Sequence, residues 1–201
     1  MSTILTSSLS AKEILMTVLL SQLWLVILLA GFLCWIASAL IHMVFKYHNA
    51  DYIELPNEAE VAEALSSQSP APGIYNMPYC ADMKQMGEES MQKKFTEGPV
   101  ALISLFPNGM PAMGKLLSLQ FAFFIFGSAL LAYLSTMAIP VGAESMTVFR
   151  FIFVAAFVAY GWGQVPHSIW LGQPWSNCAR YLLDALIYAT VSAATFAWLW
   201  P

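Results

Sequence analysis

The stretch from Ile14 to Phe45 places the tightest constraint on this chain, because its 32 residues include no Asp, Glu, Lys or Arg. A helix needs about 20 apolar residues to cross a hydrocarbon layer roughly 30 Å thick. The stretch therefore predicts a membrane-spanning helix over about Leu15–Met43. Ala37-Ser38-Ala39 resembles a signal cleavage site, but the apolar residues before it exceed the roughly 7 to 15 of a secretory signal. We expect an uncleaved span.

Three further stretches are poor in charge, and the overall composition agrees with them. The chain is 59% hydrophobic and 10% charged, whereas a soluble domain carries roughly 25% charged residues. We therefore expect an all-α integral membrane protein, built as a four-transmembrane-helix bundle with a small α+β extramembrane cap in the first loop. The other predicted spans cover about Leu116–Ile139, a segment from Thr147 that kinks or ends between Gly161 and Pro166, and Cys178–Trp200.

The first loop holds most of the charge, with 14 of the 20 charged side chains between Lys46 and Lys115. Residues 46–114 form the predicted cap, residues 1–45 the N-terminal tail and first span, and residues 115–201 the other three spans. In the cap, Asn57 is placed to begin a helix that ends near Ser67. A second helix is expected over Asp82–Phe95, and a two-stranded hairpin over Ile74–Met77 and Val100–Phe106.

Small residues recur at four-residue spacing in the last two spans. Lipid tails are as apolar as leucine, so spans associate through close packing of small residues rather than through the hydrophobic effect. We expect the two small-residue faces to contact each other. They consist of Ala155, Ala159 and Gly163 in the third span and of Ala185, Ala189, Ala193 and Ala197 in the fourth.

Ionisable groups inside a membrane are costly and often functional. Arg180 and Asp184 stand four residues apart in the fourth span, so they lie one turn apart on one helix face. We expect a structural ion pair between them, with a proton or substrate site as the alternative. His48 and Asp51, just after the first span, form a second candidate, either a metal site or a turn that leaves the membrane.

Two histidines end predicted spans at the loop side, His42 in the first span and His167 in the third. Two imidazoles from different helices at one depth are what a bis-histidine haem site requires. They are therefore candidate haem ligands. The alternative is that both are ordinary interfacial histidines.

Four sulfur side chains follow one another at three-residue intervals in the cap: Met77, Cys80, Met83 and Met86. Thioether and thiolate ligands are soft and select Cu(I), so the group is a candidate copper site. The alternative is chance clustering, because methionine is a flexible filler of irregular gaps and the chain contains 11 of them.

Three segments together resemble a group of bacterial four-span inner-membrane proteins. They are Tyr47–Pro56 (YHNADYIELP), Gly98–Val100 (GPV) and Tyr160–Trp175, which contains YGWG, Pro166 and IWLGQPW. The likeness covers most of the chain from about Ile41 onward. It implies a bacterial inner-membrane setting and one four-span unit. The group brings no known activity, so it implies no functional residues.

The sequence contains no nucleophile elbow, phosphate-binding loop, dinucleotide fingerprint or zinc pair. We expect a non-enzymatic accessory or assembly factor without a cofactor, which contacts the bilayer and a membrane-protein partner or a second copy of itself. We do not expect nucleic acid as a partner, because the acidic cap lacks the basic stripe that binding to the phosphate backbone needs. A metal or haem protein and a small oligomeric transporter are the alternatives. The distribution of bases favours periplasmic termini and a cytoplasmic cap.

Overall fold

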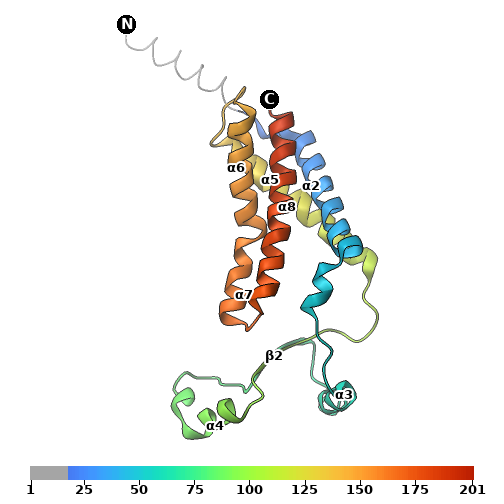
Figure 1. Ribbon diagram of the computed structural model, residues 1–201, viewed down its shortest axis with the longest axis vertical. Coiled ribbons are helices and arrows are strands. Elements are labelled where there is room, and N and C mark those ends of the chain that lie inside the picture. The colour runs from blue at the N-terminus through green and yellow to red at the C-terminus, as the bar shows by residue number, and fades with distance from the viewer. Residues whose placement is uncertain (1–17) are drawn as a thin grey trace. The chain divides into compact units, whose positions relative to one another are not determined.

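The computed structural model describes residues 18–201, and in this range four helical stretches are long and apolar enough to cross a membrane (Figure 1). Length and composition therefore agree with a multi-pass membrane protein. The predicted start of the first span at Leu15 lies outside the described residues. The first stretch comprises η1 (Leu20–Leu23), α2 (Trp24–Ala39) and η2 (Leu40–Phe45), the second α5 (Met113–Thr136), the third α6 (Ser145–Tyr160), η5 (Trp162–Gln164) and α7 (Val165–Trp170), and the fourth α8 (Trp175–Leu199).

The third stretch breaks where the sequence predicts a kink. α6 ends at Tyr160, and the single 3₁₀ turn η5 separates it from the short helix α7. Pro166 is the second residue of α7. The missing N–H of a proline is tolerated there because the first N–H groups of a helix have no partner within it.

Helix α8 is the central helix of the bundle. It packs against α6 along its length and also against α2, while α5 packs mainly on α2 (Figure 1). A smaller apolar cluster lies around Phe124, Cys34 and Ile41. The larger apolar cluster joins Leu23, Val26 and Ala30 of the first stretch, Leu131 and Ala132 of α5, Val148, Ile152 and Ala156 of α6, and Ala189, Ala193 and Phe196 of α8.

The alanine face of α8 is buried as expected, with Ala185, Ala189 and Ala193 fully enclosed. On α6 the small residue that faces the core is Ala156, whereas Ala159 is exposed. A close approach occurs at Gly161, where an added Cβ would lie 2.4 Å from the Cβ of Ala185. A glycine here therefore lets the end of α6 contact α8, as small residues do in membrane bundles.

The outward faces of the bundle are strongly apolar. Trp24, Phe32, Phe126, Val154 and Trp198 all leave large parts of their side chains uncovered. A soluble monomer rarely exposes apolar surface so continuously. This distribution is compatible with a lipid environment around the helices.

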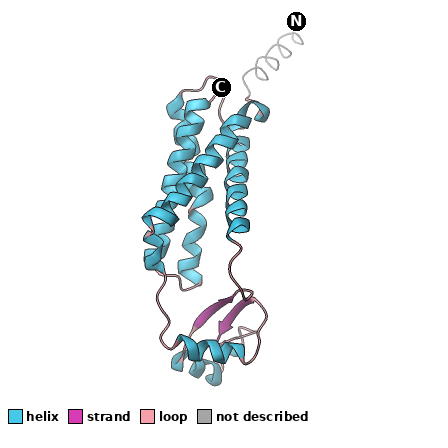
Figure 2. Cartoon of the chain, turned by 90° about the vertical axis from the view of Figure 1, so that its right-hand side faces the viewer, coloured by secondary structure: helices cyan, strands magenta, loops and turns pink. Residues whose placement is uncertain are grey.

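The chain divides into two compact units, and Tyr52–Pro111 form the smaller one. Its strands β1 and β2 pair antiparallel, with Ile74 opposite Ser104 (Figure 2). Their positions match the predicted strands, but η4 and α4 lie between them in the chain. Asn57 precedes the first helix without a side-chain capping bond. The elements are α3 (Glu58–Ser66), β1 (Gly73–Met77), η4 (Gln85–Gly87), α4 (Glu89–Glu97) and β2 (Ala101–Leu105).

The boundary of the smaller unit differs from the predicted cap of residues 46–114. Residues up to Asp51 and from Ala112 onward group with the bundle. The reason is the short 3₁₀ segment η3 (Tyr47–Asp51), which packs against α8. This packing brings polar side chains of the segment that follows the first span to the fourth span.

Candidate metal centre

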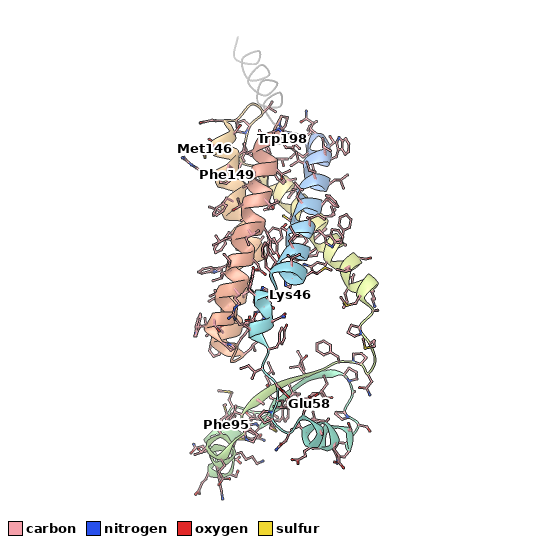
Figure 3. The ribbon with its side chains drawn as sticks, turned by 45° about the vertical axis from the view of Figure 1, so that its right-hand side comes forward. Lys46, Glu58, Phe95, Met146, Phe149 and Trp198 are labelled. Carbon is pink, nitrogen blue, oxygen red and sulfur yellow. The ribbon has the colours of Figure 1, made fainter. Side chains whose placement is uncertain are left out.

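The turn at Lys46 positions the side chains that form the candidate metal centre. Lys46 ends the π-helical segment η2 and has a left-handed backbone (φ 53°) (Figure 3). A residue other than glycine loses free energy in this conformation, so tertiary contacts must stabilise the turn. Those contacts come from Tyr47, His48 and Asp51, which the turn directs onto α8.

Both ring nitrogens of His48 face carboxylates. Nδ1 lies 2.7 Å from Oδ2 of Asp51, and Nε2 lies 2.9 Å from Oδ2 of Asp184. All three side chains are buried, with the carboxylates only 2% and 4% exposed. A neutral imidazole has one N–H and can donate to only one of them. The space between the ring and the second carboxylate therefore requires either a further proton or a metal ion.

The remaining carboxylate oxygens also have partners. The Arg180 guanidinium donates to Oδ1 of Asp51, and the Tyr47 hydroxyl donates to Oδ1 of Asp184. Burial, together with the neighbouring Asp184 carboxylate, raises the pKa of the Tyr47 phenol well above its ordinary value, so the hydroxyl remains a neutral donor. Each buried carboxylate thus has one donor besides the His48 ring, as buried charges require.

The expected ion pair between Arg180 and Asp184 takes a different form. The two residues do lie one turn apart on α8, but Arg180 pairs with Asp51 and Asp184 pairs with His48. The partners in η3 were available only because the chain turns at Lys46. The network ties the segment after the first span to the fourth span through the Asp51–Arg180 ion pair and two polar contacts with Asp184.

His42 completes a cluster with His48 and Asp184. Its Nδ1 lies 2.9 Å from the Ser38 carbonyl oxygen, and its ring stacks on that of His48 with centroids 4.9 Å apart and planes within 4°. A carbonyl oxygen only accepts, so Nδ1 carries the proton and Nε2 keeps its lone pair. One ligand atom from each of the three residues lies within 4.8 Å of the others. His42 is exposed, whereas the other two are buried.

The other predicted site residues lie elsewhere. His167 is exposed on α7, outside the cluster that contains His42. The sulfur side chains belong to different local structures of the smaller unit: Met77 ends β1, Cys80 and Met83 lie in a loop, and Met86 is in η4. The Cys80 thiol bonds the Asp82 carbonyl oxygen.

A groove of about 350 Å³ lies beside the cluster, between the end of the first span and the start of α5. Trp35, Ala39 and Met43 form one side. The other side comprises Met113, Leu116 and Leu117, and the polar residues in its wall are Ser38, His42 and Gln120. His42 therefore belongs both to the cluster and to the wall of the groove.

Sequence reasoning singled out His48 and Asp51, but it did not pair His48 with Asp184. Asp184 stands well inside the fourth span, where an acid is expensive unless it has a partner. That position was the available signal that a partner must come from another element. The contribution of Tyr47 carried no signal, because interfacial tyrosines are common in membrane proteins.

No protein-family model, no curated protein and no solved structure matches this chain. The resemblance of Tyr47–Pro56 and the other two segments to bacterial membrane proteins stays a prediction. The functional conclusion therefore depends on the chemistry of the cluster.

Proposed function

We propose that this chain is a multi-pass membrane protein that binds a divalent transition-metal ion through His42, His48 and Asp184. One observation carries the proposal: Nδ1 of each histidine lies within hydrogen-bond distance of an acceptor oxygen, the Asp51 carboxylate for His48 and the Ser38 carbonyl for His42, so each ring can donate from Nδ1 and leave Nε2 free for a metal. Metal-binding histidines almost always donate their second ring N–H in this way, which fixes the tautomer and directs the other nitrogen at the metal.

The donor set limits the metal. Two imidazole nitrogens and one carboxylate oxygen suit zinc or iron(II), whereas magnesium and calcium prefer oxygen ligands alone. The ion replaces the proton that otherwise lies between Nε2 of His48 and Asp184. Three protein ligands leave at least one coordination position open, as catalytic metal sites do.

Metal analysis of the protein purified in mild detergent tests the proposal. We expect about one equivalent of zinc or iron after reconstitution, and less than a tenth of that in H42A. His42 suits this test because, within residues 18–201, its side-chain hydrogen bond is to its own helix, so its removal leaves the hydrogen bonds of the buried network in place. H167A, which removes an exposed histidine outside the cluster, should retain the metal.

A wild-type protein that binds neither zinc nor iron(II) at micromolar concentration would contradict the proposal. A proton, and no metal ion, would then lie between Nε2 of His48 and the Asp184 carboxylate. Equal metal content in H42A and the wild type would also overturn it, because the metal would have to lie at another place.

For the setting we propose a bacterial inner membrane with periplasmic termini and a cytoplasmic loop unit. Six of the eight bases fall on the loop side of the spans, and two, Lys12 and Arg150, on the other. The positive-inside rule places the side with more bases in the cytoplasm. Cys80 is a natural reporter, because Cys34 and Cys178 are buried. A membrane-impermeant maleimide should label Cys80 in inverted vesicles and leave it unlabelled in intact cells; the reverse result would invert the orientation.

A second role, as an accessory factor that acts through protein contacts, is favoured by the smaller unit. Among its described hydrophobic residues only Met91 is buried, while Ile53, Ile74, Phe106 and Met110 are largely exposed. A sheet of two strands with so little buried surface is marginal by itself. Crosslinking in native membranes should therefore capture a partner protein or a second copy through this unit, and I74D should abolish the product. A chain that stays uncrosslinked argues against this role.

A further inference from the structure

The groove beside His42 has the properties of a ligand site rather than of a packing defect. Its volume of about 350 Å³ lies within the roughly 300–1,000 Å³ of small-molecule pockets, which are mostly apolar with a few convergent polar groups. Trp35, Met43 and Leu117 supply apolar wall, while His42 and Gln120 supply polar atoms. Two candidate membrane spans form its sides, so an apolar ligand would enter from lipid.

The net charge of the metal-loaded cluster indicates which kind of further ligand it would bind. The Asp51 and Asp184 carboxylates carry two negative charges, whereas a divalent ion and the Arg180 guanidinium carry three positive ones, and Tyr47 and both imidazoles are then neutral. One positive charge therefore remains uncompensated beside buried groups, where an unpaired charge is costly. One anionic ligand on the open coordination position would neutralise it.

Two further cationic side chains lie at the termini of the helices that line the groove. Lys46 follows η2, and Lys115 lies in the first turn of α5. Both side chains are exposed, and neither forms an ion pair within residues 18–201. Basic residues at a membrane interface attract anionic headgroups. Positive charge and an apolar wall thus occur together at this end of the bundle.

We infer that this groove binds a membrane amphiphile whose alkyl chain lies between α2 and α5 and whose anionic phosphate headgroup occupies the open metal position next to His42. The inference rests on the proposed metal site. A phosphate offers several oxygen atoms, so the group that ligates the metal keeps further oxygens for a lysine ammonium or for the Gln120 amide. A neutral headgroup would leave the cluster charge uncompensated.

Cobalt(II) provides a test, because its visible absorption reports changes of ligand directly. The Co²⁺-loaded protein in dodecyl maltoside is titrated with dodecyl phosphate and, separately, with inorganic phosphate. We expect a saturable spectral change with dodecyl phosphate and at least tenfold weaker binding of inorganic phosphate, because only the former has a chain for the groove.

Variants separate the groove from the metal. L117W fills the groove and should weaken dodecyl phosphate binding at least tenfold while one equivalent of Co²⁺ remains bound. L130W places the same side chain at an exposed position of α5 outside the groove and should bind like the wild type.

The outcomes of these experiments test the amphiphile site and the metal site separately. Bound Co²⁺ with equal affinity for the two phosphates, or an L117W variant that binds dodecyl phosphate normally, overturns the amphiphile site and leaves the metal site standing. Absence of bound Co²⁺ overturns both the metal site and the inference that depends on it.

Discussion

In the bundle unit two apolar clusters and a polar network are buried, whereas in the unit Tyr52–Pro111 the one buried hydrophobic side chain among the described residues is that of Met91. The buried carboxylates of that network have hydrogen-bond partners inside the bundle. The smaller unit has hydrogen-bonded strands and helices but almost no core. Sites that require exact geometry therefore belong to the bundle, and the smaller unit suits adaptable contacts.

The largest expected effect is the loss of a buried charge in the bundle. D184A removes the partner of both His48 and Tyr47 and should lower the free energy of unfolding by roughly 3–5 kcal/mol, as breaking a buried ion pair does. Unfolding in mixed SDS and dodecyl maltoside micelles with EDTA present measures this without metal. E63A, which removes an exposed acid of α3, should change little. A loss below about 1 kcal/mol in D184A would show that the network is not stabilising.

A methyl group at Gly161 should have the next largest effect. Its Cβ would lie 2.4 Å from the Ala185 Cβ, and overpacking of this kind costs about 1–3 kcal/mol. The double variant G161A/A185G should recover most of the loss, because it returns the missing space. G163A is the matched control, since an added Cβ there meets nothing within 4 Å. Equal losses in G161A and G163A would point to the backbone instead of the contact.

In the smaller unit we expect the substitution of Met91 to have the largest effect on stability. M91A removes its one buried hydrophobic side chain, and about 1.5 kcal/mol of burial free energy should be lost. Hydrogen exchange should accelerate in α4 and in both strands, while the amides of α8 keep their protection. Unchanged exchange in α4 would mean that a covering surface, rather than Met91, maintains the unit.

The smallest expected effect concerns the exposed pair of Lys93 and Glu97 on α4, whose charged atoms lie 3.7 Å apart. K93A should change the stability of α4 by no more than about 0.5 kcal/mol, because exposed pairs one turn apart are screened by water and salt. Exchange rates of α4 amides at low and high salt measure it. An effect as large as that of D184A would remove the contrast between the two units.

Much of the fold could be predicted because it depends on local properties. The length of charge-poor stretches indicated four spans, and Gly161 with Pro166 indicated the break in the third. The packing phase of α6 could not be predicted in the same way. Ala155 and Ala156 are adjacent, and spacing alone does not decide which of them faces α8.

The candidate site could be predicted only in part. Arg180 and Asp184 were paired because they are four residues apart, the range over which helix geometry is known in advance. Their observed partners, Asp51 and His48, are 129 and 136 residues away in the chain. No periodicity links positions so distant.

The sequence by itself determined that four charge-poor stretches can cross a membrane and that one charged loop cannot, because the cost of placing charge in lipid can be judged from residue type. The tertiary structure decided that His42, His48 and Asp184 meet. That meeting requires the left-handed turn at Lys46 and the packing of η3 on α8, which exist only once helices from opposite ends of the chain are side by side. The run from Ile14 to Phe45 thus places the candidate centre at its end, but α8 supplies the carboxylate that completes it.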